Sequence, residues 1–292
     1  MPRAKVLRFD AHAQHACRMP VVNRIDQRFA GLRRSHRSAL IPFVTAGDPL
    51  ASVEAGVGLL HALVAAGADV IELGMPFSDP MADGPVIQRA NERALARHVG
   101  LAHVLAVVRG FRTRDGQTPL VLMGYLNPIE IRGVEHFAAE ASSAGVDGLL
   151  LVDAPQDDER LAATLAAHGL HLIRLVAPTT DPARMDALAR QAQGFLYFVS
   201  ITGTTGAAAA DAGAIAAQVG SLRQHSAAPV AVGFGIRDAA GALAMAGCAD
   251  AVVIGSALVE TLHGSRDADE ACSRATRFLC PIRKALDAGE HP

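Results

Sequence analysis

The sequence predicts an α/β protein built as a single (β/α)8 barrel domain. Its 292 residues contain eight short strand-like runs, and helical segments of suitable length lie between nearly all of them. Eight parallel strands that alternate with helices over about 250 residues are typical of this barrel. A doubly wound open sheet is the alternative, but no GxGxxG motif follows the first strand and eight evenly spaced units exceed its usual number.

Each strand is predicted from an apolar run between turn-forming residues. In chain order the runs cover 39–45, 69–73, 119–123, 148–152, 171–176, 195–199, 229–232 and 251–254. An Ala-rich helix, a glycine and a strand follow one another three times, at Gly67, Gly145 and Gly247. We expect each glycine to end its helix, because glycine adopts the left-handed conformation at low cost and turns the chain into the next strand.

Composition and charge exclude several classes of protein. Half of the residues are hydrophobic, which suffices for a large core, and the net charge of -2 gives no field suited to nucleic acid or an acidic membrane. The most apolar window, 241–259, contains Asp250 and several glycines, so we expect no membrane segment. The four cysteines have no CxxC spacing, which argues against zinc or a disulfide framework and favours a cytoplasmic protein.

The first 20 residues differ from the rest of the chain. They are polar, include Lys5, Arg3, Arg8 and Arg18, and lack the apolar stretch of a secretory signal. We expect a disordered extension at 1–20, or a true start at Met19, before a barrel domain at 21–290.

The most informative segment is Glu72-Leu-Gly-Met-Pro-Phe-Ser-Asp-Pro-Met-Ala-Asp-Gly84. It places Glu72 at the end of a buried strand, and Asp79 and Asp83 on a loop that its prolines and glycines make rigid. A carboxylate in an apolar run is costly to desolvate, so Glu72 is a candidate acid–base group with a raised pKa. The alternative is a core glutamate paired with an arginine, which is the commoner fate of an isolated buried Glu.

Glycine-rich turns follow three later strands and predict a phosphate site. They are Thr202-Gly-Thr-Thr-Gly206, Gly233-Phe-Gly-Ile-Arg237 and Gly255-Ser256. Backbone N–H groups and helix N-termini at such turns bind anions. Phe43, Tyr125, Leu150, Tyr197 and Phe234 lie at or just beyond strand ends, which favours a flat hydrophobic ligand.

The scarcity of lysine and the positions of the histidines limit the reaction mechanisms that the chain could use. The only lysines, Lys5 and Lys284, lie near the termini and not at strand ends, which argues against a Schiff-base aldolase. No histidine ends a strand near the carboxylates, which argues against a histidine-bound metal, and neither Ser78 nor Ser200 has a recognisable histidine partner. Carboxylate acid–base catalysis on a phosphorylated substrate remains.

At this point the chain resembles the tryptophan synthase alpha subunit family. The matching motifs run along almost the whole chain from about residue 22. They are Pro42-Phe-Val-Thr-Ala-Gly-Asp-Pro49, Glu72 to Pro85, Leu122-Met-Gly-Tyr-Leu-Asn-Pro128, Tyr197 to Gly206, Gly233-Phe-Gly-Ile236 and Gly255-Ser256. The motif from Glu72 to Pro85 is highly specific. The resemblance implies a TIM barrel lyase of tryptophan biosynthesis. Such a lyase cleaves indole-3-glycerol phosphate to indole and glyceraldehyde 3-phosphate by a retro-aldol reaction.

The resemblance also implies a role for each matching residue. Glu72 would be the general acid/base, and Asp83 would hold the indole N–H and stabilise positive charge there. The phosphate grip would comprise Gly206, Gly235, Gly255 and Ser256, and the indole and glycerol pocket Phe43, Tyr125, Leu150, Tyr197 and Phe234. Thr205 would lie on a closing lid loop, in which Thr204 stands where the family often has Val.

A partner is implied as well. Family members work as an α2β2 complex, in which indole passes to a beta subunit that holds pyridoxal phosphate. Pro76 and Asp79 match the region that contacts this subunit, and no cofactor or metal is expected in the present chain.

Two other readings compete with this one. A different phosphate-binding barrel is the first, such as a sugar-phosphate isomerase or an indole-glycerol-phosphate synthase; the latter needs a lysine at a strand end, which this chain lacks. The second is a degenerate barrel that only activates a beta subunit. That reading predicts no indole release by the isolated chain.

Overall fold

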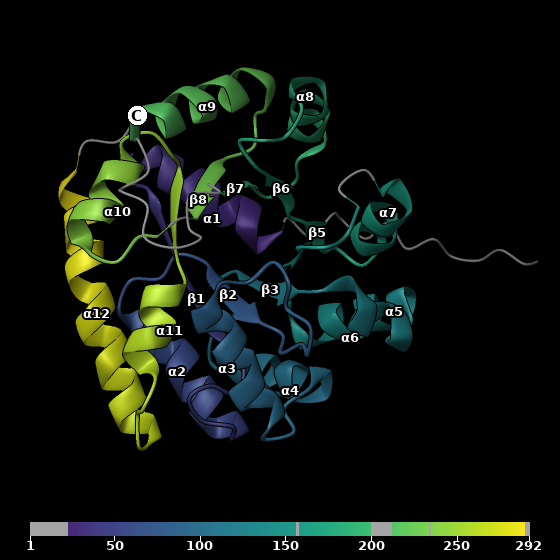
Figure 1. Cartoon of the computed structure of the whole chain (residues 1–292), viewed down its shortest axis with the longest axis vertical. Coiled ribbons are helices and arrows are strands. Elements are labelled where there is room, and N and C mark those ends of the chain that lie inside the picture. Colours follow the sequence, from purple (N-terminus) through teal and green to yellow (C-terminus); the bar gives the residue numbers. More distant parts are fainter. Residues whose placement is uncertain (1–22, 156–157, 200–211, 234, 290–292) are drawn as a thin grey trace, which may run out of the picture.

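A ring of parallel strands forms the centre of the molecule (Figure 1). The computed structural model describes residues 23–155, 158–199, 212–233 and 235–289. The expectations for residues 1–20 therefore lie outside the described residues. The strands are β1 (Ala39–Thr45), β2 (Ile71–Gly74), β3 (Leu120–Gly124), β4 (Gly148–Leu151), β5 (His171–Leu172), β6 (Arg174–Val176), β7 (Leu196–Val199), β8 (Val230–Gly233) and β9 (Ala251–Ile254).

The predicted barrel is confirmed, with one refinement at the fifth strand. The hydrogen-bonded order is β5-β4-β3-β2-β1-β9-β8-β7-β6. β5 pairs only with β4, and β6 pairs only with β7, yet a single residue, Ile173, separates them. The predicted run 171–176 is thus one strand that divides at Ile173 and bridges the two ends of the sheet.

Helices surround the barrel and cover the outer face of the strands (Figure 1). Leu73 on β2 and Leu122 on β3 belong to the apolar layer between strands and helices. The helices are α1 (Arg24–Arg34), α2 (Val53–Ala65), α3 (Pro85–Leu95), α4 (Leu101–Arg112), α5 (Leu126–Arg132), α6 (Val134–Ala144), α7 (Glu159–Ala167), α8 (Pro182–Gln191), α9 (Ala212–His225), α10 (Ala239–Ala246), α11 (Ser256–Leu262) and α12 (Ala268–Ala288).

Helix α1 closes the barrel at the end where the strands begin. Its Ile25, Phe29 and Leu32 are buried in the same apolar cluster as residues that point into the barrel. The rings of Phe29 and Phe195, just before β7, lie 5.7 Å apart between centroids. One mouth of the barrel is therefore sealed by apolar packing, which leaves the carboxyl ends of the strands as the open face, where barrel enzymes carry their sites.

The three repeated glycines do not all behave as predicted. Gly67 and Gly145 have φ values of +101° and +96°, so both occupy the region that glycine enters most readily. Gly247 is different, because it caps α10 with φ -65° and ψ -16° and stays right-handed. The prediction of a left-handed cap is confirmed at the first two positions and wrong at the third.

An aspartate follows each of these glycines by two or three residues, and its structural role was not predicted from the sequence. Asp69, Asp147 and Asp250 stand just before β2, β4 and β9. Each accepts a hydrogen bond from the first or second N–H of the preceding strand, at Leu40, Leu120 and Val230 over 3.0, 2.8 and 2.8 Å. Each also binds an arginine. The repeat therefore fixes the register of neighbouring strands.

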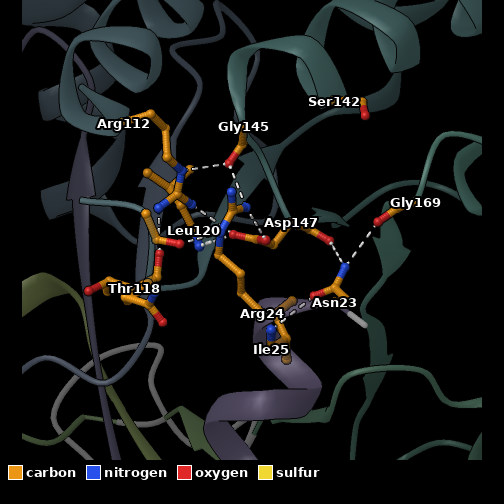
Figure 2. A network of polar contacts seen from close by, with 12 residues as sticks. Asn23, Arg24, Ile25, Arg112, Thr118, Leu120, Ser142, Gly145, Asp147 and Gly169 are labelled. Atoms are coloured by element: carbon orange, nitrogen blue, oxygen red, sulfur yellow. Dashed lines mark hydrogen bonds and ion pairs between the residues drawn. The ribbon is translucent and has the colours of Figure 1, made fainter. Parts of the chain in front are cut away.

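The network around Asp147 shows how this works (Figure 2). The carboxylate binds Arg24 of α1 at 2.7 Å and Arg112 of α4 at 2.8 Å. The amide of Asn23, which caps α1, donates to the Asp147 carbonyl oxygen at 2.8 Å. One carboxylate thus ties the sealing helix and an outer helix to the start of β4.

Candidate active site

Glu72 projects into the barrel near the open end of β2. Side chains alternate between the two faces of a strand, and Val70 points into the interior cluster while Ile71 and Leu73 face the helices. Glu72 is therefore an inward residue. In the strand register it lies opposite Phe43 on β1 and Val121 on β3.

The Glu72 carboxyl group lacks the partners that a structural carboxylate would have. The residue is 1 % exposed, and its Oε1 atom has no hydrogen-bond partner among the described residues. Burial, with a smaller contribution from the nearby negative charge of Asp83, raises the pKa of Glu72 to about 8. The side chain is therefore protonated at neutral pH, and the alternative of a core glutamate paired with an arginine finds no support in the described part of the chain.

Asp83 lies on the loop between β2 and α3, immediately before the glycine that caps α3. Its backbone N–H donates to the Pro80 carbonyl oxygen at 3.0 Å, which fixes the turn. Burial raises the pKa of Asp83 to about 6, while hydrogen bonds from Tyr125 and Asn91 act in the opposite direction. Asp83 is therefore mostly ionised at neutral pH, beside a neutral Glu72.

Tyr125, predicted to line the ligand pocket, also holds the Asp83 loop. Its hydroxyl oxygen accepts a hydrogen bond from the Ala82 backbone N–H at 3.0 Å. Its ring stacks on Phe77 of the same loop, with centroids 5.0 Å apart and planes inclined by 28°. Burial and the charge of Asp83 raise the pKa of Tyr125, so the phenol stays protonated.

The other predicted pocket residues that the structure describes lie on further strands of the barrel. Leu150 is fully buried in the barrel interior, and Tyr197 packs at the edge of the same cluster. The charges of Glu72 and Asp83 both act on the Tyr197 phenol, which places it near the two carboxyl groups. Gly74 and Gly233 make room for rings: a Cβ at Gly74 would lie 2.7 Å from Phe43 Cζ, and one at Gly233 would collide with the Tyr197 hydroxyl.

The predicted phosphate loops are described only in part. Gly255 caps α11 and Ser256 is the first residue of that helix, directly after β9. Gly235 has φ +52° and follows β8 at the same open face. Thr205, Gly206 and Phe234, as well as Thr204, lie outside the described residues.

Pro76 and Asp79, expected to contact a partner, differ in exposure. Pro76 is buried beneath its loop, whereas Asp79 is exposed. Met81 on the same loop is 85 % exposed, and Ile131 at the end of α5 is 83 % exposed. Both large apolar side chains follow strands that end at the open face of the barrel.

Sequence reasoning missed Asn91, which donates from Nδ2 to Asp83 Oδ2 at 3.3 Å. Asn91 is 4 % exposed on α3, among the buried residues Ile87, Ala90 and Ala94. A polar residue within the apolar face of an amphipathic helix was the signal that could have revealed it.

This arrangement suits proton transfer next to a site that favours positive charge. A carboxyl group that holds its proton at neutral pH is a general acid, and a neighbouring ionised carboxylate attracts a developing cation. Within the described ranges, no group of three or more His, Cys, Asp or Glu side chains could hold a metal ion.

Comparison with known proteins identifies the family. The model of the tryptophan synthase alpha chain family matches residues 29–287. Tryptophan synthase alpha chains from Xylella fastidiosa and Laribacter hongkongensis are 56% and 57% identical over 268 residues, which cover 91% of this chain and 99% and 100% of theirs.

Solved structures agree with the sequence comparisons. A crystal structure of tryptophan synthase subunit alpha from Legionella pneumophila superposes with a TM-score of 0.84 at 42% identity, covering 91% of this chain and 98% of that one. Tryptophan synthase from M. tuberculosis, in an aminoacrylate-bound form, gives 0.79 at 35% identity, covering 90% and 99%. The chain belongs to the tryptophan synthase alpha chain family.

Proposed function

We propose that Glu72 and Asp83 carry out the lyase reaction of this family, the cleavage of indole-3-glycerol phosphate in tryptophan biosynthesis. The observation that carries the proposal is the pair itself: a buried carboxyl group with a pKa of about 8 next to a carboxylate with a pKa of about 6. Between these values one group holds a proton and the other a charge. The retro-aldol cleavage needs both.

Glu72 donates its proton to C3 of the indole ring, which turns the ring into a cation. The proton of the glycerol hydroxyl then passes to the Glu72 carboxylate as the carbon–carbon bond breaks. The bonding electrons return to the ring, so indole and glyceraldehyde 3-phosphate leave and Glu72 recovers its proton. Asp83 faces the indole nitrogen, where the positive charge of the intermediate is largest. It stabilises that intermediate more than the neutral substrate.

The remaining predicted residues bind the two ends of the substrate. Phe43, Leu150 and Tyr197 form an apolar floor for the indole, together with Tyr125 and Phe234. Gly235, Gly255 and Ser256, with Gly206, offer backbone N–H groups and a hydroxyl to the phosphate. Thr205 belongs to the lid in this proposal. We propose that the chemistry uses no metal and no cofactor of this chain.

A tryptophan synthase beta subunit is the partner that the family implies. We propose that it docks at the open face of the barrel in an α2β2 assembly, receives indole there and holds pyridoxal phosphate. Met81 and Ile131, both exposed at this face, would lie within that contact. Asp79 would lie at the rim of that contact, and Pro76 would stiffen the loop beneath it.

We also propose a cytoplasmic location. Cys248, Cys272 and Cys280 are free thiols in the described part of the chain, which suits a reducing compartment. Among the described helices, none combines the length and the apolar character that crossing a membrane would require.

Indole release from indole-3-glycerol phosphate, measured with and without added beta subunit, tests the proposed function. Glu72→Gln should lower turnover about 10²- to 10⁴-fold, the usual range for a lost acid–base group. Asp83→Asn should cost about 10²- to 10³-fold, the scale of a lost charge-stabilising group. Binding of glycerol 3-phosphate should stay near normal in both variants. Substantial turnover by Glu72→Gln would refute the acid–base assignment, and no indole release by the unaltered chain under either condition would favour a degenerate barrel.

A further inference from the structure

Helix α3 starts directly behind Asp83 and presents one buried polar side chain to it. Gly84 caps the helix and Pro85 occupies its first turn. The buried face consists of Ile87, Ala90, Asn91 and Ala94. An asparagine in such a position loses its hydration, so its amide must find partners within the protein.

The Asn91 amide finds its partner in the Asp83 side chain. Nδ2 lies 3.3 Å from Oδ2, longer than the usual 2.9–3.0 Å of an N–H···O bond. Hydrogen bonds of catalytic groups are often long without substrate and tighten in the complex. An ionised carboxylate accepts hydrogen bonds but cannot donate one, so the amide must turn its NH2 group toward Asp83.

A second amide on the same helix holds the loop rather than the carboxylate. Gln88 Nε2 donates to the Asp83 backbone carbonyl oxygen at 2.9 Å and lies 3.4 Å from that of Pro80. Gln88 and Asn91 are three residues apart and therefore share one side of the helix. Gln88 thus fixes the backbone of Asp83, and Asn91 contacts its side chain.

The far end of α3 is anchored to a different loop. Arg93 makes a two-pronged ion pair with buried Asp48 after β1, at 2.7 and 2.8 Å. Arg97 donates to the carbonyl oxygens of Gly47 and Pro49 at 3.2 and 2.6 Å. Bidentate guanidinium–carboxylate pairs are geometrically specific, so α3 is a firm support for the side chains at its start.

We propose that Asn91 is a positioning residue of the reaction, which holds the Asp83 carboxylate ionised and aimed at the indole nitrogen. The inference rests on the proposed role of Asp83 and deepens it. Asn91 itself touches no reacting atom. Its contribution is to keep one rotamer and one charge state of Asp83 from substrate binding to the transition state.

The environment of Asp83 explains why a neutral donor is needed there. The groups that face Asp83 are Glu72 on β2, Tyr125 after β3 and Tyr197 on β7. All three are acids. Burial raises the pKa of Asp83, and only the hydrogen bonds from Tyr125 and Asn91 lower it. Without the Asn91 donor, Asp83 would hold its proton to higher pH and lose the charge on which its proposed role depends.

The decisive experiment compares Asn91→Leu, which keeps the shape without the donor, with Gln88→Leu from the same helix. Two quantities are measured as pH is varied: kcat/KM for indole release, and the titration midpoint of Asp83 by ¹³C NMR of carboxyl-labelled aspartate. The Asp83 signal is assigned from the Asp83→Asn spectrum. For Asn91→Leu we expect a 10- to 100-fold fall in kcat and a midpoint about one pH unit higher, with the acid limb of the profile shifted equally. Gln88→Leu should leave the midpoint in place.

A second pair keeps the test decisive if Asn91→Leu does not fold. Asn91→Gln retains an amide donor and Asn91→Met does not, although the two side chains have nearly the same length. The glutamine variant should restore much of the midpoint and the turnover that the methionine variant loses. Equal midpoints in these two variants would overturn the proposal, as would an unchanged midpoint in Asn91→Leu.

The same measurements separate this inference from the proposed function. If Asp83→Asn kept full turnover, the catalytic role of Asp83 would be wrong even though Asn91→Leu still moved the Asp83 midpoint. If Asp83→Asn lost turnover while Asn91→Leu changed neither the midpoint nor the acid limb, Asp83 would keep its role and Asn91 would be only structural.

Discussion

Two buried carboxyl groups, one just before β2 and one within it, have opposite surroundings. They belong to Asp69 and Glu72, which are three residues apart in the sequence. Asp69 accepts from the Leu40 N–H at 3.0 Å and from Arg283 Nη1 at 2.9 Å. Glu72 has neither kind of partner among the described residues, and the charge that acts on its pKa is that of another acid, Asp83.

The pKa values reflect this difference. Burial raises the pKa of Asp69, but the Leu40 N–H and three nearby arginines act against it. For Glu72 the charge of Asp83 adds to the effect of burial. Carboxylates at the sealed end of the barrel thus stabilise the fold, and those at the open end remain unneutralised and available for chemistry. Unfavourable burial is tolerated where a reaction needs it.

The largest predicted effect on stability comes from ionising Glu72. Its pKa of about 8 in the folded state exceeds the ordinary 4.5, so between these values the folded protein binds more protons than the unfolded chain. The free energy of unfolding contributed by this group therefore falls as pH rises through that window, by roughly 5 kcal/mol in total. Urea unfolding from pH 5 to 9.5 measures the fall.

The matched control for this prediction is Glu72→Gln, which removes the titration and keeps the shape. The unfolding free energies of the two proteins should diverge as pH rises above about 4.5, with the variant the more stable one, and the difference should level off above pH 8. Curves that stay parallel across the whole range would show that Glu72 titrates normally.

The next effect, at the sealed end of the barrel, is the loss of the Asp69 charge. Asp69→Asn removes the buried anion of Arg283 and leaves it only the more exposed Asp287, and breaking a buried pair typically costs about 3–5 kcal/mol. At pH 7 Glu72→Gln should instead raise stability by roughly 3 kcal/mol, because the unfolded chain gains free energy by ionising Glu72 at this pH and cannot do so with Gln. Chemical unfolding of the three proteins checks the contrast; equal losses at both positions would erase the distinction drawn between the two ends of the barrel.

Local sequence patterns predicted the barrel and the candidate acid but not the polar partners of the buried carboxylates. β2 and Glu72 could be predicted because a polar residue interrupts an apolar run that glycines bracket. The partner of Asp69 could not, since Arg283 lies 214 residues away along the chain. Asn91 lies eight residues after Asp83, and only the docking of α3 brings the two side chains together. The left-handed cap predicted at Gly247 was wrong because glycine's preference for that conformation does not enforce it, and Gly247 caps its helix in a right-handed conformation that any residue can adopt.

The smallest predicted effect tests whether the repeated aspartate matters through its charge or through its hydrogen bond. Asp250 binds Arg223 at 2.9 Å, but both side chains are about one-third exposed, so water can replace the lost anion. Asp250→Asn keeps an oxygen for the Val230 N–H and should cost about 1 kcal/mol or less, with part of that removed by 0.5 M salt. Asp250→Ala also leaves this N–H without its acceptor and should cost about 1–3 kcal/mol, independent of salt. If the alanine and asparagine variants were equally stable, register at β9 would depend on the ion pair alone, and the common role assigned to Asp69, Asp147 and Asp250 would not hold at the third position.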